Sequence, residues 1–334
     1  MRHQQMLSTH DLSIGYRNGN HVAAAIMQRL DLQLHGGRLT ALLGRNGIGK
    51  STLLRTLAGS QPALGGSVEL DGRDVTGYGG RELSRLLSLV YTDRTQAGGL
   101  TVKQLVSLGR YPYTGFFGRL DSHDRKVVND AMEATGIRHK SEAFVAELSD
   151  GERQKAMIAR ALAQETPVIL LDEPTAFLDV AARIEVMALL HRLASEQGKA
   201  ILLSTHDISQ AVSLADELWV VTHDRRVLQG CTEDLILTDA MQQLFPRSER
   251  ETVAFDPMLG DFEVPLQSAV GYQLECSDPI LRHWIANAMR RNGISTTGTA
   301  GTITVHAHGN ITLSLPDNTT AQCHSVAELL NLLI

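Results

Sequence analysis

Several features are scarce in this chain of 334 residues. It has three cysteines, and aromatic residues make up 4% of the composition. An odd, widely spaced set of cysteines argues against a disulfide framework and favours a reducing compartment. No stretch approaches the roughly 20 apolar residues that span a bilayer, and residues 1–15 lack the apolar core of a signal peptide. We therefore expect a chain that does not itself cross a membrane.

An excess of one charge is also missing. The chain has 31 Lys and Arg against 37 Asp and Glu, which gives a net charge of −6 and a pI of about 6.1. The basic residues are dispersed, so nothing favours nucleic acid as a partner. A hydrophobic content of 43% is enough for a substantial core, and the length exceeds that of one ordinary domain.

A phosphate-binding loop is the clearest motif present. Residues 43–52 read L-G-R-N-G-I-G-K-S-T, which contains G-x-x-x-x-G-K-[ST]. The apolar run 39–43 predicts the strand before the loop, and we expect a helix over 50–58, with its positive dipole end facing the phosphates. The predicted ATP-binding residues are Gly44, Arg45, Asn46, Gly47, Ile48, Gly49, Lys50, Ser51 and Thr52. Lys50 would reach the β- and γ-phosphates and Ser51 would ligate Mg²⁺. The alternative, a chance glycine-rich turn, is disfavoured because strand, loop and helix follow in order.

A pair of carboxylates follows a second apolar run. Residues 168–171 are V-I-L-L, which suits a strand buried on both faces of a parallel sheet, and Asp172 and Glu173 come next. Ligands of open α/β sheets bind at this end of the strands. We expect Asp172 to hold Mg²⁺ and Glu173 to be the general base for an attacking water. The alternative is a solvated acidic turn before Pro174.

The region 148–154, L-S-D-G-E-R-Q, resembles the signature sequence of ABC ATPases, usually written LSGGQ. Other elements of that family follow in order. Tyr16 matches the aromatic residue that stacks on adenine, Asp179 ends a match to the D-loop, and His206 matches the switch histidine that contacts the γ-phosphate. The resemblance covers roughly residues 5–250. It implies an ATPase that uses ATP and Mg²⁺, with Glu173, His206 and Lys50 as catalytic residues.

The resemblance also implies a head-to-tail dimer. The P-loop of one copy and the signature of the other would enclose one ATP. The signature residues of this chain are Leu148, Ser149, Asp150, Gly151 and Glu152, of which Ser149 and the Gly151 backbone would contact the γ-phosphate.

The implied fold is α/β. It is a P-loop NTPase with a RecA-like, mostly parallel sheet, an antiparallel β region, an inserted helical subdomain and a small C-terminal α/β domain. We place the ATPase domain at 1–250, with its core at 1–95 and 150–250 and the helical subdomain at 96–149. A polar stretch over 246–261 contains Pro246, Pro257 and Gly260 and predicts a boundary.

The accessory domain, 262–334, is expected in the order β-α-β-β-α, with a hairpin turn at 308–310. Its role cannot be read from the sequence. His283, His306, His308, Cys323 and His324 fit no standard zinc spacing, so surface and turn histidines are favoured over a metal site.

Residues 108–113, L-G-R-Y-P-Y, together with 118–120, G-R-L, look like the helical subdomain of importers for iron-siderophore, haem and cobalamin. The resemblance then implies membrane permease subunits as partners, a substrate-binding protein that delivers the ligand, and a position on the cytoplasmic face of the plasma (inner) membrane. One departure concerns the strand 87–91, after which the family has a glutamine. Thr92 and Asp93 stand there instead, and we expect both near Mg²⁺.

Two other functions compete with import. One is a soluble single-cassette ABC ATPase that acts as an assembly factor of the iron–sulfur scaffold type. The other is a nucleotide-binding module without hydrolysis, which the presence of Glu173 and His206 disfavours. The transported ligand cannot be named from this chain, because the permease and the binding protein select it.

Overall fold

The computed structural model describes residues 4–18, 21–91, 99–246, 249, 253–264, 270–307 and 309–334. Backbone contacts divide the chain into two compact units. One unit contains residues 1–250 and 254–263, and the other contains residues 251–253 and 264–334. Within the described part, no helix is both long and apolar enough to cross a bilayer. Thr92, Asp93 and His308 lie outside the described residues.

A six-stranded sheet forms the centre of the first unit. Its order is β11 (Val227–Cys231), β10 (Glu217–Val221), β4 (Arg38–Leu43), β9 (Ala200–Thr205), β8 (Val168–Leu171) and β7 (Leu87–Val90), and only β11 is antiparallel. Alternate residues of β4 enter different hydrophobic clusters, Leu39 and Leu43 in one and Leu42 in the other. The sheet is therefore buried on both faces, which explains its continuous apolar runs. The predicted mostly parallel sheet is confirmed.

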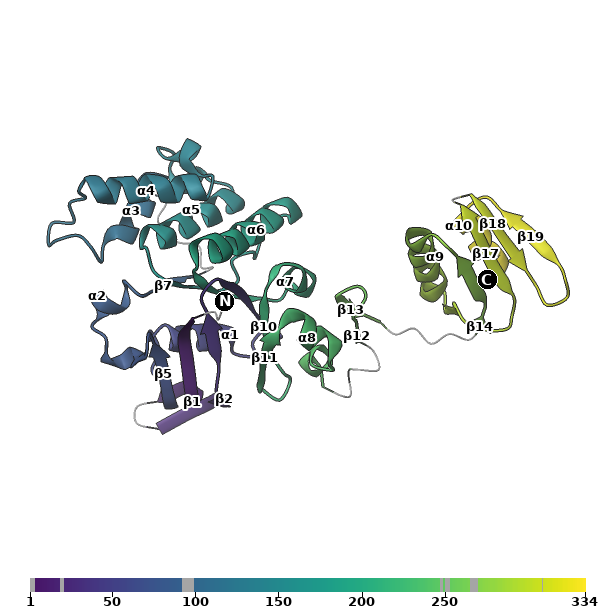
Figure 1. Cartoon of the computed structure of the whole chain (residues 1–334), viewed down its shortest axis with the longest axis horizontal. Helices are drawn as coiled ribbons and strands as arrows, with labels where there is room; N and C mark the ends of the chain where they lie inside the picture. Colours follow the sequence, from purple (N-terminus) through teal and green to yellow (C-terminus); the bar gives the residue numbers. More distant parts are fainter. Residues whose placement is uncertain are drawn as a thin grey trace. The chain divides into compact units, whose positions relative to one another are not determined.

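Helices follow or precede these strands along the chain. They are α1 (Lys50–Leu57), the short α2 (Gly80–Leu83), α6 (Val180–Gln197), α7 (Ile208–Leu214) and α8 (Thr232–Leu237). The predicted antiparallel region is also present, in the order β2 (His21–Leu30), β1 (Gln5–Asn18), β5 (Gly65–Leu70) and β6 (Arg73–Asp74), with β3 (Gln33–His35) paired to β1. Figure 1 shows β1, β2 and β5 below α1, on the side of the unit away from α3, α4 and α5.

The inserted helical region contains α3 (Val102–Ser107), α4 (Ser122–Ala134) and α5 (Asp150–Ala163), which pack against one another (Figure 1). Each begins with a capping box, in which the N-cap side chains are those of Thr101, Asp121 and Ser149. Such caps satisfy backbone N–H groups that have no partner inside the helix.

A buried arginine joins α4 to the end of α5. Arg110 is 1% exposed. Its Nε donates to Asp124 Oδ1 at 2.8 Å, and its Nη1 donates to Ala163 O at 2.8 Å and to Glu165 Oε2 at 2.6 Å. The guanidinium also lies 4.1 Å from the ring centre of Tyr113. Burial alone would raise the pKa of Asp124, but the bonds from Arg110 and from the Asp121 backbone N–H hold it below its ordinary value.

Removing this arginine should destabilise the unit strongly. Arg110→Leu leaves Asp124 buried without its cation, and loss of one partner of a buried ion pair costs about 3–5 kcal/mol. Urea unfolding followed by circular dichroism should show the midpoint falling. Arg138→Leu is the matched control, because its ion pair with Glu133 is exposed and such pairs contribute about 0–1 kcal/mol. Equal midpoints for the two variants would show that the cluster does not stabilise the fold.

The first unit ends in a hairpin that the sequence analysis missed. Strands β12 (Ala254–Asp256) and β13 (Asp261–Glu263) pair within and just beyond the stretch where we expected only a polar boundary. Phe262 holds the hairpin in place through edge contacts with Phe245 and Phe255, at ring-centre distances of 4.8 and 5.3 Å.

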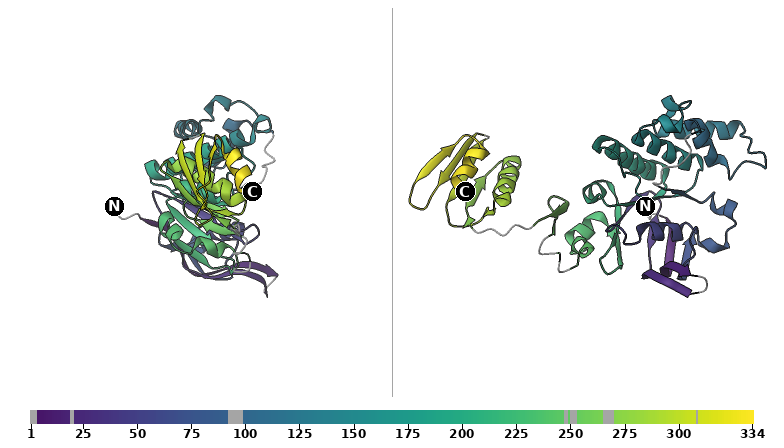
Figure 2. Two further views of the ribbon diagram at one scale, coloured as in Figure 1. Left: turned by 90° about the vertical axis from the view of Figure 1, so that its right-hand side faces the viewer. Right: turned by 180° about the vertical axis from the view of Figure 1, so that it is seen from behind.

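The second unit is a small α/β domain with its own core. Its sheet has the order β15 (Gln273–Cys276), β17 (Thr302–Ala307), β18 (Asn310–Ser314) and β19 (Thr320–Cys323). A short parallel pair joins β14 (Val270–Gly271) to β16 (Ile294–Ser295). The helices are α9 (Pro279–Arg291) and α10 (Val326–Leu333), and Figure 2 shows α9 alongside the sheet.

Two details of the second unit differ from expectation. Strand β19 was missed, because its T-A-Q-C sequence has little apolar alternation. The apolar residues Ile280, Trp284, Ile285 and Met289 predict one buried face for α9, but only Ile285 and Met289 lie in the core, whereas Ile280 and Trp284 are 68% and 61% exposed. The antiparallel pairing of β17 with β18 confirms the expected hairpin.

Candidate functional site

Three neighbouring strands of the central sheet bring the candidate residues together. β4 leads into the phosphate-binding loop, β8 leads into Asp172 and Glu173, and β9 leads into His206. These strands are parallel and adjacent, so their carboxyl ends share one edge of the sheet. Residues separated by more than 150 positions therefore meet at one site.

The loop before α1 depends on glycine at two positions. Gly47 and Gly49 have φ of 75° and 118°, conformations that other residues rarely adopt. A Cβ at Gly49 would also lie 2.4 Å from Ile26 Cγ2. The loop thereby leaves its backbone N–H groups and the start of α1 available to an anion.

Lys50 is the buried cation of this loop. It is 5% exposed, and its Nζ donates to Gly44 O at 2.8 Å. The same Nζ lies 3.6 Å from Glu173 Oε1. Burial lowers the pKa of the Lys50 ammonium, while the charges of Glu173 and Asp172 counter part of that effect.

The carboxylate pair is held by a residue that the sequence analysis did not assign. Ser204 Oγ donates to Asp172 Oδ1 at 2.7 Å and accepts the Glu173 backbone N–H at 2.9 Å. Asp172 is 9% exposed. Glu173 has φ of 46°, a sparsely populated conformation that costs about 1–3 kcal/mol for a residue with a side chain. Ser204 lies two residues before the predicted motif residue His206, but nothing in its sequence context distinguishes it from other strand serines.

His206 approaches the same carboxylate from β9. Its Nδ1 lies 3.6 Å from Glu173 Oε2. The imidazole is 56% exposed and contributes, with Gly44, Arg45 and Asn46, to a cavity of about 240 Å³. Leu244 and Phe245 form the apolar wall of this cavity. The structure thus brings Lys50, Asp172, Glu173 and His206 together beside a hollow at the phosphate-binding loop.

The remaining predicted residues occupy three further places. Tyr16 projects from β1, where its hydroxyl lies 3.1 Å from Thr52 Oγ1 and half of the residue is exposed. Asp179 caps α6 by accepting the Ala182 N–H at 2.8 Å. The signature residues begin α5, within the helical region, so they lie on a different part of the unit from α1 (Figure 1).

The signature is organised as a helix cap. Ser149 Oγ accepts the Glu152 N–H at 3.2 Å, and Glu152 Oε2 accepts the Ser149 N–H at 2.9 Å. This backbone bond, with help from Lys140, lowers the pKa of Glu152. Glu152 stands where LSGGQ has glutamine. Its carboxylate therefore completes the N-terminal cap of α5.

Comparison with known proteins identifies the family. Residues 27–176 match the ABC transporter family, and residues 273–333 match the iron ABC transporter C-terminal domain. The chain is 37% identical over 249 residues to the ferric enterobactin transport ATP-binding protein FepC of Escherichia coli, an alignment that covers 75% of this chain and 89% of the relative. It is 36% identical over 239 residues to the iron(3+)-hydroxamate import ATP-binding protein FhuC of Bacillus subtilis, covering 72% and 87%. The chain belongs to the ABC transporter ATP-binding proteins.

Solved structures agree with this assignment. An inward-facing ABC transporter assigned to the metal-chelate type matches with a TM-score of 0.62 and 30% identity, over 72% of this chain and 89% of that chain. A dimeric bacterial ABC transporter cassette matches with a TM-score of 0.59 and 25% identity, over 68% and 99%. The predicted family, fold class and ATPase activity are confirmed, and the assembly-factor alternative is not favoured.

Proposed function

We propose that this chain is the ATP-hydrolysing subunit of a membrane importer for iron chelates of the siderophore type. The observation that carries the proposal is the pairing of an ABC ATPase unit with a second unit that matches the iron ABC transporter C-terminal domain. The names of the relatives FepC and FhuC support iron-siderophore import rather than another substrate.

The proposed chemistry follows from the position of each group. The loop amides, the N-terminus of α1 and Lys50 bind the phosphates of ATP. Glu173 accepts a proton from the attacking water, and His206 contacts the γ-phosphate from the end of the neighbouring strand β9. Tyr16 packs on the adenine. Lys50 stands at the start of α1, and Glu173 and His206 follow the ends of β8 and β9, which suits positioning for phosphoryl transfer.

The oxygen groups at this sheet edge fit Mg²⁺, which prefers hard oxygen ligands. Ser51 follows Lys50 in α1, and Asp172 is fixed by its bond from Ser204. Mg²⁺, when bound, neutralises charge on the phosphates. Thr92 and Asp93 follow the neighbouring strand β7, and their part in the metal site stays a prediction.

An exposed apolar surface supports a second copy as partner. Phe177, Val180 and Ile184 are 82%, 67% and 50% exposed, although large apolar side chains gain free energy from burial. Phe177, in the D-loop, also has φ of 64°. Gly151 of the signature lies beside Ala182, which stands between Val180 and Ile184 at the start of α6. We infer that this surface faces the P-loop of the second copy in a head-to-tail dimer.

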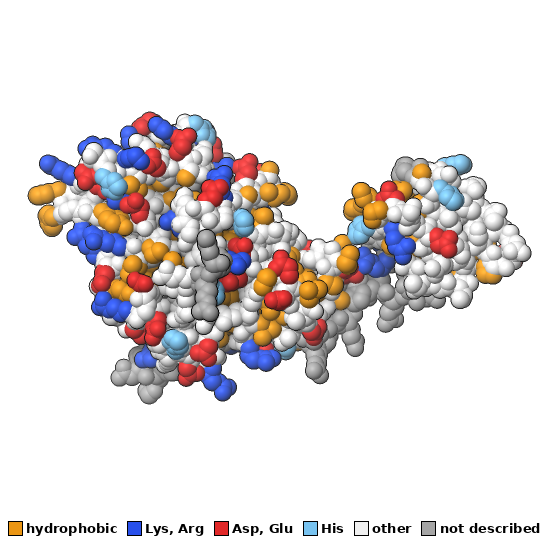
Figure 3. Space-filling view, in the orientation of Figure 1, with side chains coloured by type: hydrophobic (Ala, Val, Ile, Leu, Met, Phe, Trp, Pro, Cys, Tyr) orange, Lys and Arg blue, Asp and Glu red, His pale blue; other side chains and the backbone are white. Residues whose placement is uncertain are grey.

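A different surface supports a permease partner. Tyr111, Phe116 and Phe117 are 76%, 99% and 83% exposed in the loop between α3 and α4. Figure 3 shows hydrophobic and basic side chains together at that end of the helical region. Between this loop and α2 lies a cavity of about 530 Å³, lined by Arg81, Tyr111 and Phe116 among others.

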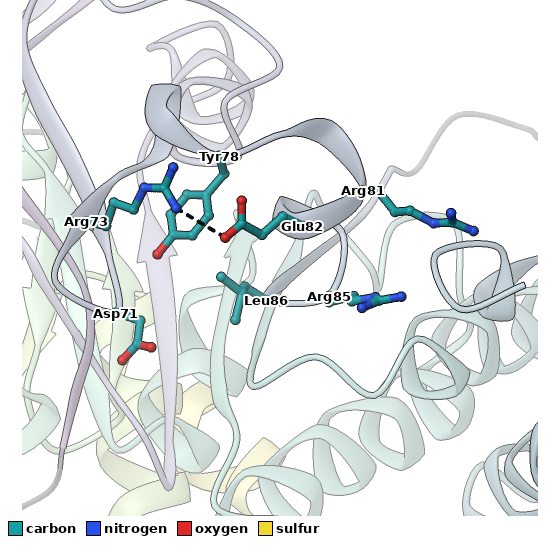
Figure 4. A pocket seen from close by; sticks show the side chains of 7 residues that line it. All are labelled: Asp71, Arg73, Tyr78, Arg81, Glu82, Arg85 and Leu86. Carbon is teal, nitrogen blue, oxygen red and sulfur yellow. Dashed lines mark hydrogen bonds and ion pairs between the residues drawn. The ribbon is translucent and has the colours of Figure 1, made fainter.

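A second cavity, of about 660 Å³, extends this surface past α2. Figure 4 shows its lining, in which Arg73 pairs with Glu82 while Arg81 and Arg85 point away from them. Arg81 and Arg85 donate to the carbonyl oxygen of Pro112 and so hold the aromatic loop in place. We infer that the permease docks here, on the cytoplasmic face of the membrane, and that a substrate-binding protein delivers the iron chelate to it.

The proposal is tested in cells that lack this gene. Complementation with the wild-type chain should restore ATP-dependent uptake of a radiolabelled ferric siderophore, and the chain purified from membranes should carry a polytopic protein with it. Phe117→Asp should abolish both while leaving the basal ATPase activity of the isolated chain intact. Leu237→Asp, an equally exposed apolar position on α8, should have no effect. Normal uptake without this chain would exclude the function.

A further inference from the structure

The first turn of α6 contacts three of the motifs at once. It begins directly after the D-loop, whose Asp179 caps it. Arg183, in this turn, carries a guanidinium that faces the loop after β9. On the other side, the turn packs against the signature helix α5. Neither Arg183 nor this junction has a role in the chemistry described above.

Arg183 joins the D-loop to the loop that carries His206. Its Nη1 donates to Asp207 Oδ2 at 2.7 Å, and its Nη2 donates to Leu178 O at 3.1 Å. The Arg183 side chain is 32% exposed and that of Asp207 is 15% exposed. A planar guanidinium can make both bonds at a fixed separation, whereas a lysine ammonium would act as a point charge.

Asp207 is itself held firmly. Its carboxylate accepts the Gln210 N–H and the Ser209 hydroxyl, each at 3.2 Å, and so caps α7. Burial alone would raise the pKa of Asp207, but the bonds from Arg183, Gln210 and Ser209 keep it below its ordinary value. Asp207 follows His206 directly, so a shift of Arg183 is passed to the backbone that positions the imidazole.

The same turn is fixed to the signature helix. A Cβ at Gly151 would lie 3.1 Å from Ala182 Cβ, so the two backbones are closely packed. One turn further along, Lys155 Nζ lies 2.5 Å from Glu185 Oε2. The signature, the D-loop and the His206 loop are therefore connected through a single helical turn.

We propose that Arg183 is a positioning residue that couples the two ATP sites of the dimer by tying His206 to the D-loop and signature of its own chain. The inference rests on the proposed head-to-tail dimer. In that dimer His206 serves the ATP on its own P-loop, whereas the signature of the same chain serves the other ATP. A movement of the signature at one site then reaches His206 at the other through the packing of Gly151 on Ala182 and the bond from Arg183 to Asp207. Coupling of this kind requires a physically connected element between the sites, and the first turn of α6 contacts the D-loop, the signature and the loop that carries His206.

The test is Arg183→Gln. Glutamine keeps much of the length of the side chain but lacks the positive charge and the pair of N–H donors that bind Asp207 and Leu178 together. Steady-state ATP hydrolysis should show kcat reduced by roughly 5- to 50-fold, because small displacements of catalytic groups cost this much or more. The Hill coefficient for ATP should fall towards one. The affinity for a fluorescent ATP analogue and the Tm should stay unchanged, since the P-loop is untouched. Arg226→Gln is the control, because it removes a similar Arg–Asp bond of 2.7 Å in the turn between β10 and β11.

A second variant tests whether the pair is responsible. Asp207→Asn removes the charge but keeps a good helix cap. If the two residues act through their bond, the double variant should be no slower than the slower single variant. An unchanged kcat and Hill coefficient in Arg183→Gln would overturn the proposal, as would a fall in Tm together with equal losses in kcat and affinity. If the wild-type chain itself shows no ATP hydrolysis above a Lys50→Ala variant, the proposed function fails instead.

Discussion

Glu173→Gln is expected to lower ATP hydrolysis by roughly 10²–10⁴-fold, because the amide cannot take the proton of the attacking water. The two carboxylate oxygens lie 3.6 Å from Lys50 Nζ and 3.6 Å from His206 Nδ1. Both neighbours remain in place in the variant, and the side chain keeps its size. ATP should therefore still bind, and its phosphates supply more negative charge to Lys50 than the substitution removes.

Phosphate release measures the loss, and size-exclusion chromatography with ATP should show the dimer accumulating, since hydrolysis no longer separates the copies. Glu133→Gln is the control, because Glu133 forms an exposed ion pair on α4 away from the loop. Turnover of Glu173→Gln at the wild-type rate would show that another group activates the water.

The sheet edge that brings Lys50, Glu173 and His206 together was predictable, because the strands that form it can be read from local sequence. The runs before Gly44, Asp172 and His206 are mostly apolar, as strands buried on both faces tend to be, and parallel strands place their carboxyl ends together. The S-x-x-E pattern of Ser149 and Glu152 was not used in the sequence analysis, although it is a local signal and forms the capping box at the start of α5.

The parts that could not be predicted depend on contacts between distant segments. Ser204 is one of many serines until β9 is placed next to β8, where it reaches both Asp172 and the Glu173 N–H. Arg183 reads as an ordinary polar residue of an amphipathic helix, and its bonds to Leu178 and Asp207 need the tertiary fold. The hairpin β12–β13 is three residues per strand and depends on Phe262 packing between Phe245 and Phe255. Short strands of this kind carry no periodicity long enough to read.

Ser149→Asp is expected to abolish hydrolysis without abolishing ATP binding. Aspartate is as good an N-cap as serine, so α5 keeps its first turn. The new carboxylate would repel the γ-phosphate that the signature of the opposite copy is meant to contact. In the Glu173→Gln background, Ser149→Asp should therefore bind ATP as a monomer and fail to form the ATP-dependent dimer. A signature that served the ATP of its own chain would instead lose nucleotide affinity.

Mixing two inactive variants tests the head-to-tail arrangement by a gain of activity. A Lys50→Ala copy paired with a Ser149→Asp copy forms one site with both defects and one site with neither. With independent sites and random pairing in a closed dimer, activity should return to as much as about a quarter of the wild-type rate. The coupling inferred for Arg183 lowers that figure, because the defective site then slows its intact neighbour. Adding Arg183→Gln to both copies should remove this slowing of the intact site. The activity of that mixture, divided by the activity of the Arg183→Gln dimer, should then exceed the activity of the original mixture divided by that of the wild-type dimer. A mixture with no activity, together with an ATP affinity lost in Ser149→Asp, would show that each chain completes its own site.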